Sequence, residues 1–205
     1  MIIPEPKFST IRNSPRVRLL EDWLIESEYG LMLIVPRGFE TDLASVPRWL
    51  WPILSPFGDL RYGGIIHDFG YQHAYLLSPY SGDQAYNLES IALREKYPAL
   101  FGGCIPVFIG KKRDFFDQLL RYVTIQATGE KLKAESAYLA LKAFGWIAWN
   151  KYRKLGPAAY NANSLGLPTI SKDEIPSRTN DESLKQFDAV LADLERATED
   201  RERLA

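Results

Sequence analysis

The residues of this chain best suited to chemistry lie in the segment IIHDFGY, residues 65–71. On a helix His67 and Tyr71 are four residues apart and share one face, while the adjacent Asp68 projects roughly 100° away. Imidazole is the side chain that most readily exchanges a proton near neutral pH. A carboxylate is a good ligand for a hard cation such as calcium. His67 is therefore a candidate general base, and Asp68 a candidate metal ligand.

A second candidate is Asp117, in the helical segment KKRDFFDQLLRYVTIQA. It lies at the edge of an apolar face that includes Phe116 and Leu120, where a carboxylate is costly without a partner. A histidine on a facing helix is the natural partner. If Asp117 and the Tyr71 hydroxyl orient His67, the imidazole can take a proton from water. The same residues also fit a structural polar network in the core, which residue types alone favour. Both interpretations stay open here.

Composition excludes several classes of site. The chain has only two histidines, His67 and His73, and one cysteine, Cys104. Three-histidine metal sites, multi-cysteine zinc modules and internal disulfide frameworks are therefore excluded. No histidine precedes His67, so an HD-type phosphohydrolase, which needs one, is excluded too. With 25 basic and 26 acidic side chains, no specific nucleic-acid partner is predicted.

Residue patterns predict the elements that position these side chains. Residues 16–26 and 29–36 read as a β-hairpin. Thr41, Asp42 and Ser45 are helix-capping types before a short helix around Pro47. Helices are expected over residues 60–75, 82–97, 114–128 and 133–154, the last ending at Gly156-Pro157, and residues 98–110 are predicted to be a loop. The helix over 60–75 contains Gly63, Gly64 and Gly70, at a cost of roughly 1 kcal/mol each, so we expect close steric approach there.

The expected fold class is α+β and mostly helical. It would combine an N-terminal β-hairpin or small sheet with a central antiparallel helical pair that carries His67 and Asp117. Residues 1–156 would form the globular domain and residues 157–179, rich in proline, glycine and polar side chains, a linker. Residues 180–205 would form an amphipathic helix.

The expected C-terminal helix presents apolar side chains at helical spacing, namely Leu184, Phe187, Leu191 and Leu194. We predict that this stripe docks on a partner. Charge is segregated along the chain: residues 157–205 carry six basic and 10 acidic side chains, net −4, whereas residues 111–154 carry 10 basic and four acidic ones, net +6. The basic helical pair is most simply explained as a solvated surface.

Four motifs in order resemble the domain of unknown function 1353 family, which is found mainly in phages and prophages. They are GFETDLASVPRWLW, the HDFGY segment, Arg113 four residues before Asp117, and YLALKAFGWIAW. The resemblance spans about residues 30–150, with a long insertion at roughly residues 76–110. It implies that Thr41, Asp42, Ser45 and Arg113 belong to the family's characteristic residues.

The HDxxY motif followed by a helical aspartate is also similar to the active-site helices of calcium-dependent secreted phospholipases. That similarity implies His67 as general base, Asp68 as a calcium ligand, and Tyr71 and Asp117 as residues that orient His67. Calcium would then be the only cofactor. The Gly-rich calcium loop of those enzymes is replaced here by a bulky, proline-rich segment before His67.

Two functions follow from these resemblances. The first is a bacteriophage virion-associated structural protein, a tail, neck or capsid-associated component. Its partners would be other virion proteins, in several copies of a symmetric assembly. It would be made in the host bacterial cytoplasm, because no signal peptide or transmembrane segment is recognisable. The alternative is a phage-encoded, metal-dependent hydrolase, lipid esterase-like, that aids entry and contacts the membrane. We expect the first function.

Overall fold

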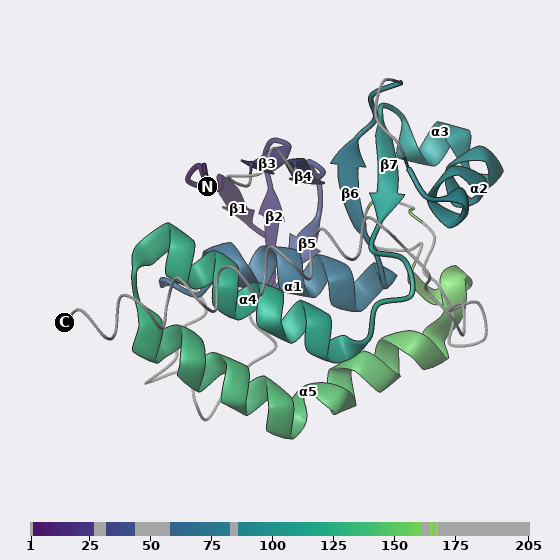
Figure 1. Ribbon diagram of the computed structural model, residues 1–205. Coiled ribbons are helices and arrows are strands. Elements are labelled where there is room, and N and C mark those ends of the chain that lie inside the picture. The colour runs from purple at the N-terminus through teal and green to yellow at the C-terminus, as the bar shows by residue number, and fades with distance from the viewer. Residues whose placement is uncertain are drawn as a thin grey trace, which may run out of the picture.

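Two antiparallel sheets and five helices make up the described part of the chain (Figure 1). The computed structural model describes residues 2–26, 32–43, 58–82, 86–160, 165 and 167, with the backbone alone at 155–160. The first sheet has the order β1-β2-β5 and the second β3-β4-β6-β7. The strands are β1 (Phe8–Thr10), β2 (Val17–Leu19), β3 (Trp23–Glu26), β4 (Met32–Val35), β5 (Glu40–Thr41), β6 (Leu76–Pro79) and β7 (Cys104–Val107).

The helices are α1 (Arg61–His73), α2 (Leu88–Lys96), α3 (Pro98–Phe101), α4 (Arg113–Thr128) and α5 (Lys131–Tyr160). In Figure 1 the two sheets lie on one side of α1, and α4 and α5 lie on its other side. The short helices α2 and α3 both lie beside β7, on the side away from β6. Helix α1 is therefore the central element, and 11 of its 13 residues are buried.

The mostly helical fold with a small N-terminal sheet is not what the structure shows, and that prediction is wrong. Half of the second sheet comes from β6 and β7, which follow α1 in sequence. The segment 98–110, expected to be a loop, forms α3 and β7 instead. The glycines and the proline of this segment favour a loop over a strand. Because β7 lies at the edge of its sheet, however, it tolerates Pro106, which lies opposite Leu77.

The predicted N-terminal hairpin is confirmed only in part. Strands β3 and β4 pair antiparallel, as expected of a hairpin, with Trp23 opposite Val35 and Glu26 opposite Met32. The run 16–26, expected to be one strand, divides into β2 and β3, which belong to different sheets. Alternation explains each piece, because Val17 and Leu19 are buried around the exposed Arg18, and Trp23 and Ile25 around the exposed Leu24.

Two helix boundaries differ by more than two residues from those expected. The helix expected from residue 82 begins at Leu88, after Asn87, whose side chain accepts a hydrogen bond from the Ser90 amide. Helix α5 continues past Gly156-Pro157 to Tyr160. A proline costs one backbone hydrogen bond in a helix, and here it does not end the element.

Helices α1 and α4 pack antiparallel at close range. A Cβ atom built on Gly63 would lie 2.3 Å from the Leu120 carbonyl oxygen, and one built on Gly70 would lie 2.1 Å from the Phe116 ring. Helix α4 ends at Thr128, and its C-cap Gly129, with a φ of 75°, adopts the left-handed conformation that turns the chain into α5. Among the described helices, none has the length and apolar character needed to cross a membrane.

Candidate functional site

The side chain of His67 lies in the centre of the molecule with no exposed surface. Its Nε2 atom is 3.1 Å from Oδ1 of Asp117 on α4, and its Nδ1 atom is 3.2 Å from Oδ1 of the neighbouring Asp68. Both ring nitrogens therefore face carboxylates. The predicted contact between His67 and Asp117 across the helix pair is present.

Asp117 has two further partners. The Tyr71 hydroxyl donates a hydrogen bond to its Oδ1 atom at 2.5 Å. A guanidinium nitrogen of Arg113, one turn earlier on α4, lies 3.5 Å from its Oδ2 atom. Arg113 also donates to the Leu141 carbonyl of α5 at 2.6 Å, so its side chain joins the buried carboxylate of Asp117 to α5.

Asp68 connects the network to the last residue of β5, Thr41, and to the loop that follows it. The Thr41 hydroxyl donates to its Oδ2 atom at 2.5 Å and accepts a hydrogen bond from the Leu43 amide. A hydrogen bond also joins the carboxyl groups of Asp42 and Asp68. The TD pair of the first motif and the HD pair of the second are thus in direct contact.

The charges of this network balance. Burial opposes a charge on His67, but its hydrogen bonds with Asp117 and Asp68 prevail and raise its pKa. The pKa of Asp68 is lowered, because the bond with His67 outweighs the cost of burial. Burial, and then repulsion from Asp68, raise the pKa of Asp42 to about 7.

Near pH 6, therefore, Asp42 is largely a neutral carboxyl that donates to Asp68. The imidazolium of His67 and the guanidinium of Arg113 offset the carboxylates of Asp68 and Asp117. A buried set of ionised groups is stable only when it is paired in this way. Burial raises the pKa of Tyr71, so its hydroxyl stays protonated and serves as a donor.

Close backbone packing makes room for the network. A Cβ atom on Gly64 would lie 1.4 Å from the carbonyl oxygen of Leu43, next to the Thr41–Asp42 pair. A Cβ atom on Gly145 of α5 would lie 2.5 Å from the Tyr71 hydroxyl. The expected steric reason for the glycines of α1 is thereby found, and it is close approach of protein rather than of a ligand.

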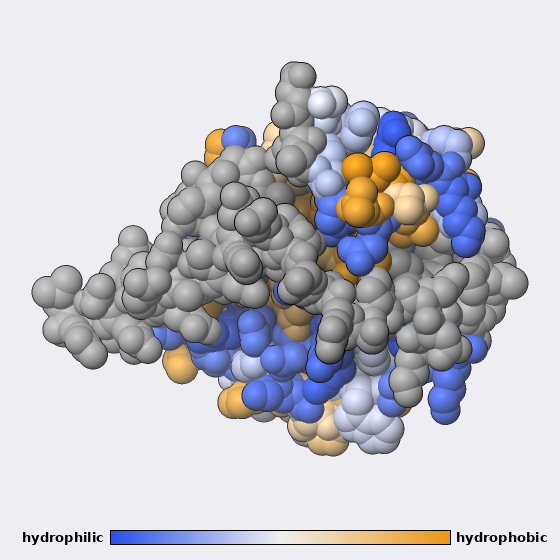
Figure 2. Space-filling model, turned by 45° about the vertical axis from the view of Figure 1, so that its right-hand side comes forward, coloured by the Kyte–Doolittle hydropathy of each residue, from blue (hydrophilic) through white to orange (hydrophobic). Residues whose placement is uncertain are grey.

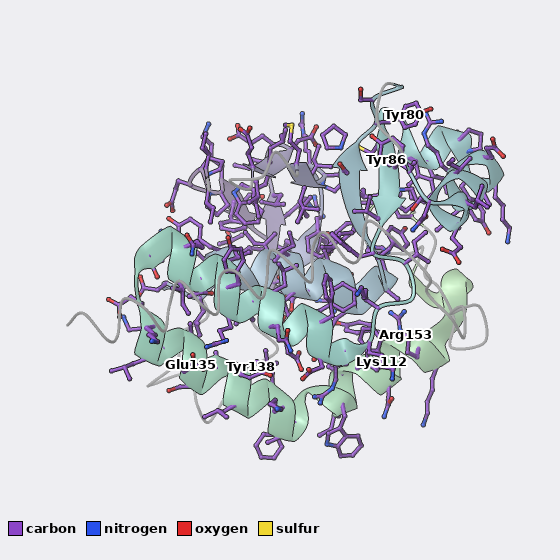
Figure 3. The ribbon with its side chains drawn as sticks, viewed as in Figure 1. Tyr80, Tyr86, Lys112, Glu135, Tyr138 and Arg153 are labelled. Atoms are coloured by element: carbon purple, nitrogen blue, oxygen red, sulfur yellow. The ribbon has the colours of Figure 1, made fainter. Side chains whose placement is uncertain are left out.

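Arg153 is a buried residue that the sequence reading missed. From α5 it reaches the C-terminal end of α1 (Figure 3) and donates to the carbonyls of Tyr71 and Gln72 at 2.6 and 2.9 Å. Burial lowers its pKa to about 10, and its guanidinium lies over the Trp149 ring at 4.6 Å. The sequence does contain a signal for its burial. Leu141 and Gly145, four residues apart, are buried, and Arg153 lies on the same side of the helix two further steps of four residues along.

The other predicted site residues are placed as follows. Ser45 lies outside the described residues, as do the docking residues Leu184, Phe187, Leu191 and Leu194. Asp68, predicted as a calcium ligand, is bonded to protein groups on both of its oxygens. Within the described ranges no three His, Cys, Asp or Glu side chains are arranged to hold a metal ion.

Comparison with known proteins gives one match. The family model described as Protein of unknown function (DUF1353) matches residues 17–141, which hold every residue of the network. No curated protein and no solved structure matches the chain. Because the match spans more than half of the 205 residues, this protein belongs to the DUF1353 family.

Proposed function

We propose that this protein is a structural, virion-associated component of a bacteriophage, and that its His-Asp-Tyr-Asp network stabilises the fold without catalysing a reaction. The observation that carries the second part is the state of His67. Its ring has no exposed surface and both nitrogens are within 3.2 Å of carboxylates.

General-base catalysis needs a ring nitrogen that is unprotonated and within reach of water or substrate. The raised pKa of His67 favours the imidazolium, which has no lone pair to accept a proton. Asp68 occupies the Nδ1 side, where an attacking water would have to lie. The arrangement instead favours a fixed ion-pair network that joins α1, α4 and the loop after β5.

The proposed location in a virion rests on the resemblance of this family to phage and prophage proteins. Tail, neck and capsid-associated positions are all compatible with that resemblance. The partners would be other virion proteins, with several copies of the chain in a symmetric assembly.

The test is quantitative mass spectrometry of purified particles of the encoding phage. Particles that contain the chain at a fixed copy number support the proposal, and particles that lack it while the host lysate contains it contradict it.

A metal-dependent hydrolase is the second candidate. The contacts of His67 with Asp117, and of Tyr71 with Asp117, are those that a phospholipase-like site would use. The discriminating measurement is calcium titration by calorimetry on the full chain beside Asp68→Asn. Binding that the variant abolishes, followed by lipid cleavage that His67→Gln abolishes, would favour the hydrolase. No cleavage of lipid vesicles at millimolar calcium would leave the structural role.

A further inference from the structure

The outer side of α5 is an exposed apolar stripe on a basic helix. Leu139, Trp146 and Ile147 keep 63, 55 and 56% of their surface exposed, and their spacing of seven and eight residues places them on one side of the helix. Figure 3 shows aromatic side chains that project from α5 away from α4. Along the lower edge of the molecule in Figure 2, hydrophobic residues lie among strongly hydrophilic ones. Exposed large apolar side chains that cluster in this way mark a binding surface.

Basic side chains border the stripe. Lys142 lies three residues after Leu139 and four before Trp146, and Lys151 and Lys154 are exposed on the following turns. A partner that fits this face is therefore apolar along one side and acidic beside it.

The chain itself contains such a segment. Leu184, Phe187, Leu191 and Leu194 recur at spacings of three and four residues, the pattern of a helix with a narrow apolar seam. Asp188 and Glu195 directly follow two of these positions and so flank the seam. Residues 180–205 hold eight acidic and four basic side chains, net −4, opposite in sign to the α4–α5 region.

The connection is long enough. The chain returns to the core after α5, where Leu167 is buried, and 16 residues separate it from Leu184. A flexible chain of that length has a root-mean-square span of roughly 22 Å, and fully extended it reaches about 53 Å. Two packed helix layers are about 20 Å thick, so the segment can reach the outer side of α5.

The apolar spacing, the opposite charge and the length of the connection all fit one occupant. We infer that the C-terminal segment 180–205 docks as an amphipathic helix on the Leu139–Trp146–Ile147 face of α5 in the same chain, and not on a partner as its sequence pattern predicts. Short tethers produce millimolar effective concentrations, so docking within one chain prevails over exchange between copies. The inference concerns contacts inside one molecule and does not depend on the virion proposal.

The test is hydrogen exchange measured by mass spectrometry on the full chain. We expect the amides of residues 184–194 to exchange at least about tenfold more slowly than in an unstructured peptide. The double variant Trp146→Ser/Ile147→Ser should remove that protection, and Phe187→Ser should in turn increase exchange in α5. Leu88→Ser, which alters an 82% exposed leucine on α2, is the matched control and should change neither segment.

A charge exchange tests the orientation of the segment. Lys142→Glu should reduce the protection of residues 184–194, and adding Asp188→Lys should restore it at least in part. Three outcomes would overturn the inference: no protection in the unaltered chain, protection that the α5 substitutions leave unchanged, or protection that rises with protein concentration between about 1 and 100 µM. The last would indicate a second copy as the occupant.

Discussion

The imidazole ring of His67 lies between the carboxylates of Asp68 and Asp117. The contribution of each surrounding residue to stability follows from that position. The imidazolium satisfies Asp68 and Asp117 at once, while Thr41 and Tyr71 supply further hydrogen bonds. Removing the His67 imidazolium leaves the buried carboxylates of Asp68 and Asp117 with only the Arg113 guanidinium to offset them. Removing one neutral donor leaves the ion pairs in place.

We therefore expect His67→Gln to lower the free energy of unfolding by about 3–5 kcal/mol, the typical loss when a buried ion pair is broken. Tyr71→Phe should cost less, about 1–3 kcal/mol, because one hydrogen bond to Asp117 is lost. Urea denaturation followed by tryptophan fluorescence measures both. Equal losses for the two variants would contradict an ion-pair role for His67.

At the scale of elements, α1 is held from three directions. Its glycines admit α4 and the Leu43 backbone, and Arg153 from α5 binds the carbonyls at its C-terminal end. The last carbonyls of a helix have no partner within it, and a cation there is favoured by the helix dipole. The network is thus positioned by packing at both ends of one helix.

Gly64→Ala should be strongly destabilising, by about 3 kcal/mol or more, because the new methyl group would overlap the Leu43 carbonyl, which is backbone and cannot rotate away. Gly103→Ala is the matched control, since nothing lies within 4 Å of a Cβ atom there. It should be neutral or slightly stabilising. Thermal unfolding of both variants measures the difference, and a stable Gly64→Ala protein would refute the close approach.

Arg153→Met should keep the volume of the side chain but remove both hydrogen bonds to α1. We expect a loss of about 2–4 kcal/mol in unfolding free energy and faster hydrogen exchange in residues 70–75. Lys151→Met, on the exposed side of the same helix, is the control. If both variants unfold at the same denaturant concentration, the cap contributes nothing to stability.

For the whole molecule, the network predicts how stability depends on pH. The folded-state pKa of Asp42, about 7, lies above its ordinary value of 3.8, so the folded state binds more protons between these values. The stability that this group contributes is present below pH 3.8 and is lost as pH rises through 7. The raised pKa of His67 adds a loss above pH 6.5, whereas the lowered pKa of Asp68 adds a loss as pH falls below 3.8.

Asp42→Asn should remove the first of these dependences. The unaltered protein should lose stability between pH 4 and 7 by up to about 1.4 kcal/mol per pH unit from this group, and the variant should show a flatter profile. The amide can still donate to Asp68. Denaturation midpoints at several pH values across this window measure the slope, and parallel profiles for the two proteins would show that the Asp42–Asp68 pair holds no shared proton.

The sequence by itself determined the local part of this protein. Helical periodicity located α1 and α4 to within two residues, and i,i+4 spacing placed Tyr71 beside His67 and Arg113 beside Asp117, because such contacts depend only on the helix repeat. The cost of Asp117 on an apolar face also identified His67 as its partner. These inferences rest on one helix, or on one pair of facing helices.

The tertiary structure alone decided what the network does. Thr41 and Asp42 meet Asp68 across 27 and 26 residues, and Arg153 meets Tyr71 across 82; no local spacing encodes such distances. The second sheet likewise includes β6 and β7, which follow α1 in sequence. The glycines and the proline of residues 98–110 predict a loop where the edge strand β7 forms. Whether His67 faces water or a second carboxylate depends on how separate segments pack, because burial and charge are properties of the assembled core.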